Sequence, residues 1–495
     1  MKKYSIIVLL LIIINTHARS SIERNSQTFM TTRPINQNIA ATQSGWHTIL
    51  YNKPGKNKIS FQCYSIYQAS IDSKKNARYF LPFECKNELL VTGDQSSNVK
   101  NRDIRAEWLG INNSEFSGKF SIDPHQKQMA IFLEANKDLN SIIESSFFEN
   151  MWLSINVPVV AVENDLRIKQ FDIINRAQTF PEDIIEALCR KQLRFSRIAK
   201  NGRNDLGIAE INIKLGRTYL AQDNFEVIYY SGLRIPGSHA QNAHFLFDSY
   251  LGNNKHFGFQ TGVHFQINLS HETSYFTGCF FANLETTFFI RNEQLRTFDL
   301  KNKPWSRYML LNRKGGPPDQ NIPATKIFTL RTQVKPYNIV ELSTGWRIKI
   351  NSIEAEFGYD LWAHGNEDLE CVCTFEEVYG IAGNGANMLG LARSASQSTI
   401  TTRAENDMIQ QTICNDNQLQ CENIETFITI DRNDLDIKSA GARAAINHKF
   451  HAALSYVAHG KNTEGCITIG ALYEYPQKNT ALELWAFWIK CGVSF

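Results

Sequence analysis

The sequence predicts an all-β protein: a closed antiparallel transmembrane β-barrel of about 12 strands, with 14 as the alternative, short periplasmic turns and long extracellular loops. Three observations predict it. Long segments carry apolar residues at every second position, short turns alternate with long polar stretches, and the last alternating strand ends on an aromatic residue. The composition agrees, because 43% hydrophobic and 20% charged residues exclude a wholly disordered chain. A mean hydropathy of −0.31 excludes a helical membrane bundle.

The first residues have the pattern of an export signal. Lys2 and Lys3 precede the apolar run SIIVLLLIII, and Ala18 offers a small residue at the expected cleavage point. We therefore expect a signal peptide over 1–18, cleaved after Ala18. The alternative is an uncleaved anchor helix, but the apolar run is shorter than the roughly 18 residues that a spanning helix needs. Residues 19–56 are then a periplasmic leader or a short plug, and 57–495 form the barrel with a long loop at 365–435.

The alternation is clearest in FGFQTGVHFQINL, residues 257–269, where the odd positions are mostly large and apolar and the even positions are polar or glycine. Because successive strand residues point to opposite faces, one face is apolar and the other polar. The same pattern recurs along the chain, as in Ala209–Leu215, where Ala209, Ile211 and Ile213 share the apolar face. The predicted strands are 57–69, 119–135, 149–162, 206–220, 225–235, 256–269, 275–290, 339–350, 353–363, 439–457, 465–475 and 482–495. The tenth span is long enough to hide a hairpin, which would give 14.

Connections of two kinds separate these strands. Short turns such as 222–224 and 351–352 contrast with long polar stretches at 167–203, 291–337 and 365–435. This asymmetry is typical of outer-membrane barrels. One long stretch carries a helix signal, a capping box at Thr179–Glu182 followed by DIIEALCR. That helix either folds inward to narrow the lumen or lies on the outer rim.

The last strand, WAFWIKCGVSF, ends the chain on Phe495. An aromatic end on an alternating strand resembles the signal that bacterial outer-membrane barrels present to their insertion machinery. The residues assigned to that signal are Phe487, Ile489, Val493 and Phe495.

If the apolar faces contact lipid, the alternate residues face the lumen. Charged residues must lie there, because Lys or Arg in the bilayer midplane costs roughly 2–4 kcal/mol. The residues assigned to the lumen are Lys214, Arg234, Arg347, Lys349, Glu210, Glu285, Glu354, Glu356, Asp360 and Lys490. The two signs are balanced, so we expect cross-strand ion pairs, such as Arg347 or Lys349 with Glu354 or Glu356, and weak ion selectivity.

The cysteines Cys371, Cys373, Cys414 and Cys421 cluster in one polar stretch. In an oxidising compartment they predict one or two loop disulfides, and zinc is the alternative, although the spacing matches no common zinc pattern. We therefore assign no metal and no cofactor. No nucleophile elbow, zinc-protease motif or phosphate-binding loop is present, so no catalytic residue is assigned and the protein is predicted not to be an enzyme. A net charge of +3 gives no sign of a nucleic-acid partner.

Several segments resemble uncharacterised porin-like outer-membrane β-barrel proteins of Gram-negative bacteria. They are SFFENMWLSINVPVV at 146–160, GNNKHFGFQTG at 252–262, RTFDL at 296–300, YGIAG at 379–383, SASQSTI at 394–400 and the ending WIKCGVSF. The resemblance covers most of the chain but its motifs are structural. It implies an outer-membrane location and contact with membrane lipid, the barrel-insertion machinery and small solutes.

The expected function is thus a narrow, weakly selective porin-like channel for small solutes. Two alternatives remain open at this point. One is a surface adhesin or anchoring barrel that acts through its large extracellular loops, above all 365–435. The other, less favoured, is an outer-membrane hydrolase with a site at the outer rim.

Overall fold

The computed structural model of the 495-residue chain describes most of it. The described residues are 26–45, 59–71, 74–83, 86–140, 142, 146–175, 180–222, 225–269, 276–317, 320–372, 374–386, 392–402, 427–460 and 463–495. Ala18 and the whole predicted signal peptide lie outside them, as do Cys373, Cys414 and Cys421.

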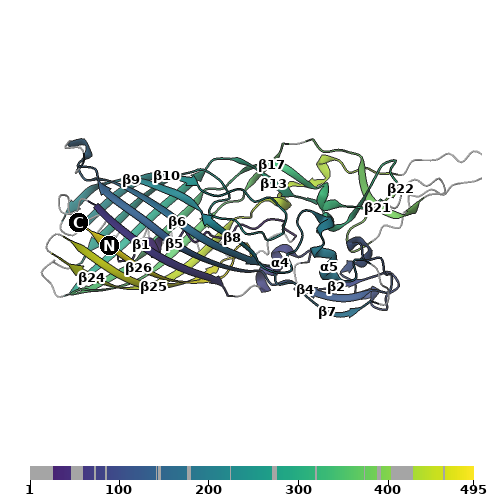
Figure 1. Cartoon of the computed structure of the whole chain (residues 1–495), viewed down its shortest axis with the longest axis horizontal. Coiled ribbons are helices and arrows are strands. Elements are labelled where there is room, and N and C mark those ends of the chain that lie inside the picture. The colour runs from purple at the N-terminus through teal and green to yellow at the C-terminus, as the bar shows by residue number, and fades with distance from the viewer. Residues whose placement is uncertain are drawn as a thin grey trace, which may run out of the picture.

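Twelve of the described strands form a closed antiparallel barrel (Figure 1). Each strand pairs with the next one along the chain, and the last pairs with the first, so the sheet has an up-and-down order without a free edge. At the seam, Ile59 and Phe495 exchange two backbone hydrogen bonds of 3.1 and 3.0 Å. The barrel strands are β1 (Ile59–Ser70), β5 (His125–Asp138), β6 (Met151–Asp165), β9 (Glu210–Gln222), β10 (Phe225–Pro236), β11 (Gly258–Asn268), β12 (Phe276–Phe289), β18 (Ile339–Ile350), β19 (Ile353–His364), β24 (Ala445–His459), β25 (Glu464–Pro476) and β26 (Leu484–Ser494).

The prediction of 12 barrel strands is confirmed, and each predicted span overlaps one of them. The alternative of 14 is wrong, because the long span 439–457 holds a single strand, β24, preceded by a short 3-10 helix, η8 (Ile437–Ala440). The predicted span 119–135 begins before its barrel strand. Its first residues belong to β4 (Ser117–Ser121), which pairs with β2 (Glu88–Thr92) and β7 (Lys169–Ile174) outside the barrel.

The outer wall of the barrel is apolar. Its rows of exposed large side chains include Phe61, Ile131, Phe259, Phe357 and Ile469. Exposed apolar area on this scale is stable in hydrocarbon rather than in water, and the ring of twelve strands has no unpaired edge. The barrel is therefore built to span a membrane.

Within the part of the chain that is described, no helix is both long and apolar enough to cross a membrane.

One strand outside the ring, β8 (Arg203–Ile208), extends the barrel wall. Residues 151–156 of β6 pair with β9, and residues 159–164 pair with β8. Ala209, between β8 and β9, is only 1% exposed, and its N–H donates to the Pro158 carbonyl over 3.2 Å. The prediction that Ala209 shares the outward face with Ile211 and Ile213 is wrong, because one extra residue shifts the alternation here, as a β-bulge does.

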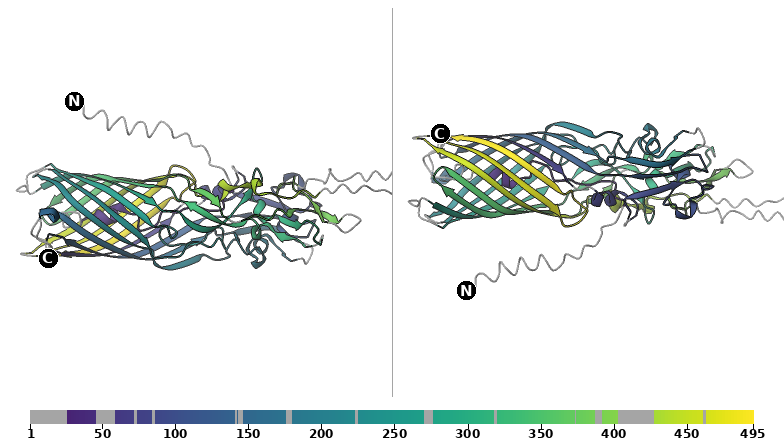
Figure 2. Two further views of the ribbon diagram at one scale, coloured as in Figure 1. Left: turned by 90° about the horizontal axis from the view of Figure 1, so that it is seen from above. Right: turned by 90° about the horizontal axis from the view of Figure 1, so that it is seen from below.

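The two ends of the barrel differ. We call the end where β1 begins and β26 ends the turn end, because most connections between strands are short there. At the opposite end, the loop end, long connections fold together into a second body that continues the long axis of the barrel (Figure 2). We call this body the cap. Its elements are α4 (Lys74–Phe80), β2 (Glu88–Thr92), η1 (Val99–Asn101), β3 (Ile104–Arg105), η2 (Ala106–Leu109), β4, β7 (Lys169–Ile174), α5 (Ile184–Cys189), η4 (Lys191–Leu193), β13 (Asn292–Thr297), β14 (Asp299–Leu300), η5 (Ser306–Tyr308), β15 (Leu310–Arg313), β16 (Ile322–Pro323), η6 (Ala324–Lys326), β17 (Thr329–Lys335), β20 (Asp368–Cys371), β21 (Tyr379–Ala386), β22 (Ala392–Ser394), η7 (Arg432–Asp434), β23 (Leu435–Asp436) and η8.

The predicted helix of the long connection 167–203 exists as α5, but its start and its position differ from the prediction. Asp183 caps it, and its side chain accepts the N–H of Glu186 over 2.7 Å, whereas Thr179 lies outside the described residues. Ile184 and Leu188 are fully buried in the cap core. The helix therefore lies neither in the lumen nor on the outer rim.

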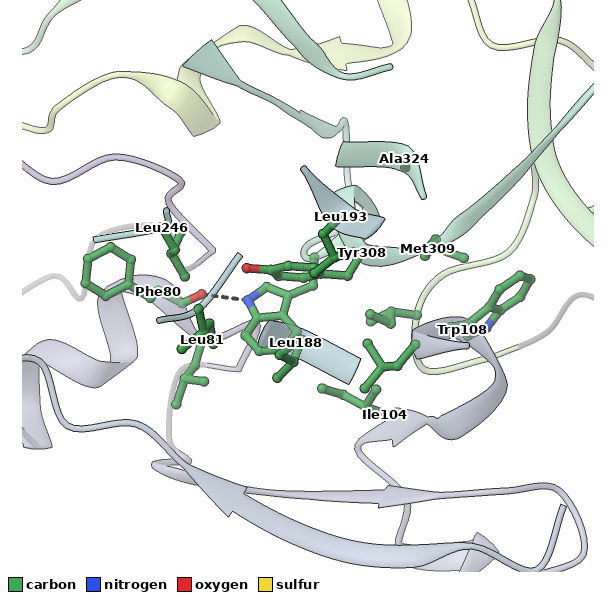
Figure 3. Close-up of a cluster of buried hydrophobic side chains, with 14 of the residues drawn as sticks. Phe80, Leu81, Ile104, Trp108, Leu188, Leu193, Leu246, Tyr308, Met309 and Ala324 are labelled. Atoms are coloured by element: carbon green, nitrogen blue, oxygen red, sulfur yellow. Dashed lines mark hydrogen bonds between the residues drawn. The ribbon is translucent and has the colours of Figure 1, made fainter. Parts of the chain in front are cut away.

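The cap has its own hydrophobic core, which draws side chains from most of the long connections (Figure 3). At its centre the buried Trp305 donates its indole N–H to the Phe80 carbonyl over 2.6 Å and lies edge-on to Tyr308. These contacts join the connection after β1 to the connection after β12. The cap is thus a folded unit rather than a set of separate loops.

We expect Trp305→Ala to destabilise the cap by about 3–5 kcal/mol, because it removes a fully buried indole and leaves a cavity. Limited proteolysis of the membrane-embedded protein should then cut cap segments much faster than in the parent. Trp346→Ala, which removes a tryptophan 43% exposed on the outer wall, is the control and should leave cap cleavage unchanged. Equal cleavage of both variants would contradict a cooperative cap.

Candidate functional site

The described chain begins with a segment that is tied to the cap. The Ser26 N–H donates to the Leu81 carbonyl over 3.0 Å, and its hydroxyl donates to Asp299 over 2.6 Å. The Tyr79 hydroxyl donates to the Phe29 carbonyl over 2.9 Å, and burial raises the pKa of this phenol, so it stays a donor. We call residues 26–45 the N-terminal segment.

From the cap the N-terminal segment descends into the barrel, where Arg33 is its main polar anchor. The guanidinium donates to Glu474 over 2.7 Å and to the Gln68 side chain over 3.0 Å, and a third bond, of 2.8 Å, reaches the Gln37 carbonyl within the segment. The side chains of Arg33 and Glu474 are both 0% exposed. Removing one partner of such a buried pair leaves an uncompensated charge, at a cost of about 3–5 kcal/mol.

Further contacts fix the segment to other strands of the wall. The Trp362 indole of β19 donates to the Gln37 side chain over 2.8 Å. On the opposite side, the Ile35 N–H donates to the Gln128 side chain of β5 over 2.9 Å. The segment is therefore held from several directions inside the ring.

Deeper in the lumen the segment forms a short helix, α2 (Ile39–Gln43). The Asn38 side chain caps its start by accepting the Ala41 N–H over 3.2 Å. At its end, Lys490 donates to the carbonyls of Ala41 and Thr42 over 3.0 and 2.8 Å. A cation at this place satisfies carbonyls that the helix leaves without partners.

Gly45 ends the described part of the segment, with φ of +68°, which favours glycine. A Cβ there would collide with the hydroxyls of Ser455 and Thr468, which bond to each other over 2.8 Å. The backbone of the segment thus lies directly against the wall formed by β24 and β25.

The ten charged residues assigned to the lumen are all at least half-buried. Lys214 and Lys349 are half-buried, and the other eight are buried. They separate into two clusters on the wall, plus Lys349 and Lys490. Lys349 lies 3.3 Å from His459 near the turn end, whereas Lys490 holds the N-terminal segment.

The first cluster surrounds Arg234 of β10. Its guanidinium lies 3.0 Å from Glu210, 2.7 Å from Glu285 and 4.0 Å from Glu341. Lys214 adds a second cation, 2.8 Å from Glu285. Three carboxylates therefore share two cations, and charge is nearly balanced within the cluster.

The second cluster lies on β18, β19 and β24. Arg347 is 3.1 Å from Glu354 and 2.9 Å from Glu356, which are two of the cross-strand pairs that the sequence predicts. His451 lies 3.4 Å from Glu356 and 3.2 Å from Asp360. The ion pairs of both clusters join residues of the barrel wall.

Little space remains beside α2. A cavity of about 50 Å³ lies between the helix and the wall and is lined by Thr42, Tyr64, Glu134, Asn156 and Lys214, among others. Glu134 accepts hydrogen bonds from Asn156 over 2.8 Å and Ser154 over 3.2 Å. This volume suits a few water molecules and is far below the roughly 300 Å³ of a small-molecule pocket.

Sequence reasoning assigned no role to Arg33 or to any other residue of the N-terminal segment. One signal was available, because Arg33 is the sole Lys, Arg, Asp or Glu between Arg24 and Lys53. A single cation in a long stretch without other charged residues suggests a buried ion pair. The partner, Glu474, is 441 residues away along the chain.

The residues assigned to the insertion signal lie on the outer wall. Phe487, Ile489, Val493 and Phe495 are 41% to 50% exposed, on the lipid-facing side of the last strand. The Phe495 ring lies 6.1 Å from the Phe61 ring, across the seam between β26 and β1. In the described part of the chain, no group of three or more His, Cys, Asp or Glu side chains is arranged to hold a metal ion.

No protein-family model matches the chain, and no curated protein matches its sequence. Among solved structures, it is similar to an outer membrane channel from Pseudomonas putida F1, at 8% identity and a TM-score of 0.39, over 90% of this chain and 100% of that one. A FadL homologue from Pseudomonas aeruginosa has 7% identity and a TM-score of 0.30, over 95% and 99%. The beta domain of the Bordetella autotransporter Brka has 7% and 0.29, over 89% and 100%.

The strand pairing itself shows the fold, and the two faces of the wall show its environment. A closed barrel of even strand number, apolar outside and charged inside, is the architecture of outer-membrane proteins. The protein is an outer-membrane β-barrel whose lumen holds the N-terminal segment.

Proposed function

We propose that this protein is a gated, weakly selective channel for small solutes, closed by its N-terminal segment. The observation that carries the proposal is the contrast between the wall and the segment. The ion pairs around Arg234 and Arg347 are made between residues of the wall itself and would remain without the segment. If the segment left, the wall would remain polar and could hold water, as a weakly selective pore requires.

In this proposal, the turn end faces the periplasm and the cap faces the exterior, as short turns and long loops do in outer-membrane barrels. Residues 1–18 would act as the export signal and be removed. The segment 26–45 would then act as a plug, held mainly by Arg33, Lys490 and Trp362. Opening would require water to replace these bonds.

Planar-bilayer recordings test the proposal. The parent protein should be mostly closed, with rare stepwise openings. Arg33→Ala should raise the open fraction by at least about tenfold, because a loss of even 1.4 kcal/mol shifts an equilibrium tenfold and the closed state loses more than that. The open fraction should rise rather than fall because of Glu474. In the variant this carboxylate is buried without its cation when the segment is in place, but it becomes hydrated when the segment leaves.

Two controls make the recording specific. Arg33→Lys keeps the charge and should give an intermediate effect. Arg331→Ala removes an arginine whose side chain is 72% exposed beside Glu293 in the cap and should behave like the parent. An Arg33→Ala protein that folds and stays as silent as the parent would contradict gating by this segment.

A second function is favoured by the cap. Its core unites most of the long connections around Trp305, which gives the protein a folded body at the loop end suited to adhesion or anchoring. Under this alternative the barrel only carries the cap. Bilayers would stay silent even without the N-terminal segment, and binding to host surfaces would depend on cap residues, including those of 365–435.

We also propose that the last strand is read by the insertion machinery. Removing Phe495 should lower the fraction of protein that assembles into a heat-modifiable barrel in cells, because the exposed terminal aromatic is then lost. Phe61→Ala removes its ring neighbour across the seam without touching the end of the chain and serves as the control. Unchanged assembly after loss of Phe495 would show that the ending is not such a signal.

A further inference from the structure

Two cysteines face each other across the seam of the barrel. Cys63 of β1 and Cys491 of β26 are directly opposite residues in the antiparallel register of these neighbouring strands (Figure 1). Both are exposed on the outer wall, and the Cys491 sulfur lies 3.6 Å from the Cys63 carbonyl oxygen. Two thiols that are 428 positions apart in the sequence therefore meet at one place. We call Cys63 and Cys491 the seam cysteines.

The other cysteines on the described barrel strands are not opposite a second cysteine. Cys466 of β25 is buried, and its partner in β26 is Gly492. Cys279 of β12 is also buried, between Asn268 and Arg347 of its two neighbouring strands. A single cysteine often acts only as a small hydrophobic residue. Two that coincide at paired positions of one face point instead to chemistry that needs both sulfurs.

The backbone geometry of the seam suits a bond between these sulfurs. Ile59 and Phe495 exchange two backbone hydrogen bonds, and every second pair of antiparallel strands does so, which includes the seam cysteines. The Cα atoms of such a pair lie about 5.5 Å apart, inside the range of roughly 4.4–6.8 Å found in disulfides. The Cβ atoms must approach by only about 1 Å, from roughly 5.5 Å to roughly 4.5 Å. Neither strand has to change its register.

We propose that the seam cysteines form a disulfide that closes the barrel covalently. The two thiols lose two protons and two electrons, and one S–S bond forms. The electrons reduce the disulfide of a thiol oxidant in the periplasm to two thiols. One cysteine first attacks that disulfide to give a mixed disulfide, and the other then displaces the oxidant. The inference is independent of whether the barrel conducts.

The position of the seam cysteines determines when this exchange can occur. Their neighbours on the same face, Phe61, Ile489 and Val493, are exposed on the lipid-facing wall. The thiolate is the reacting form of a cysteine, and a charge is strongly disfavoured in hydrocarbon. The exchange therefore belongs to assembly, before lipid surrounds the seam. Once formed, the bond should resist water-soluble reductants for as long as the barrel stays folded in the membrane.

The bond would join the first and last strands of the ring. Two ring contacts already cross this seam on the outer wall, Phe61 with Phe495 at 6.1 Å and Tyr67 with Trp485 at 5.5 Å. The seam cysteines lie between these two contacts along the strands. Because a disulfide stabilises more when it closes a longer loop, a link that encloses nearly the whole barrel should have a large effect.

Mass spectrometry of protein taken from outer membranes tests the bond. Cells are lysed in N-ethylmaleimide, which blocks free thiols, and the denatured protein is digested without reduction. The parent should yield one pair of peptides joined through Cys63 and Cys491. The pair should be absent from Cys63→Ala but present in Cys466→Ala, the matched control on the next strand. Complete blocking of both seam cysteines by the reagent would overturn the proposal, and so would a link between Cys491 and Cys466.

Gels run without reductant measure what the bond does. The temperature at which the folded band converts to the unfolded band should be several degrees higher for the parent than for Cys63→Ala/Cys491→Ala. The boiled parent should also migrate faster without reductant than with it, because its unfolded chain is closed into a ring. A water-soluble reductant should remove this difference only when it is added after unfolding. Equal conversion temperatures for the two proteins would refute a stabilising link at the seam.

Discussion

A protein that lacks residues 26–45 is expected to form long-lived open channels, whereas the parent stays mostly closed. The deletion removes α2 and the Arg33 anchor but leaves the wall clusters around Arg234 and Arg347 intact. The freed lumen would fill with water, since it is lined by paired charges. Stepwise conductance in planar bilayers measures the result, and a heat-modifiable mobility shift verifies that the variant has folded.

The opposite change should lock the same segment in place. The Cβ position that Gly45 would carry lies 3.2 Å from the Ser455 Cβ, close to the roughly 3.5–4.5 Å spanned by a disulfide. Gly45→Cys/Ser455→Cys should abolish the rare openings of the parent when oxidised and recover them after reduction. Gly45→Cys alone controls for the left-handed backbone at that residue. A folded deletion variant that never conducts would refute a pore beneath the segment.

Arg234→Met should cause the largest loss of stability among single changes in the lumen. The arginine faces three carboxylates, so its removal leaves Glu210 without its ion-pair partner and removes one cation from beside Glu341, at a cost of about 3–5 kcal/mol. The temperature at which the folded band converts to the unfolded band should fall by several degrees. In the chain lacking 26–45, the same change should shift the pore toward cations, because the wall loses positive charge.

Two variants separate charge from shape in that experiment. Arg234→Lys retains the charge without the planar fork and should lose less stability. Arg331→Met removes an exposed arginine of the cap and should leave the conversion temperature unchanged. A parent-like conversion temperature for Arg234→Met would mean that lumen water already screens this cluster.

The barrel could be predicted from the sequence because its whole outer face contacts the same environment, the lipid. Lipid favours an apolar residue at each outward position. Phe259, Val263 and Phe357 therefore show the period of two within their own strands, whichever strands they pair with. The charged lumen residues follow from the same period. The bulge at Ala209 was missed, because an extra residue shifts the alternation without changing the composition.

The cap and the N-terminal segment could not be predicted in the same way. Most cap elements are too short to show a period, and Trp305 is buried by residues far away in sequence, such as Phe80. The segment has neither strand nor long-helix periodicity. Its position depends on the pairing of Arg33 with Glu474, which only the folded barrel brings together.

The direction of the N-terminal segment affects the topology of the whole molecule. Ser26 is bonded within the cap, while β1 starts at the opposite end of the barrel with Ile59. The backbone therefore passes along the barrel axis once before its first strand, and then twelve more times as strands. An odd number of passages leaves Ser26 and Phe495 on opposite faces of the bilayer, even though the ring of strands itself is even-numbered.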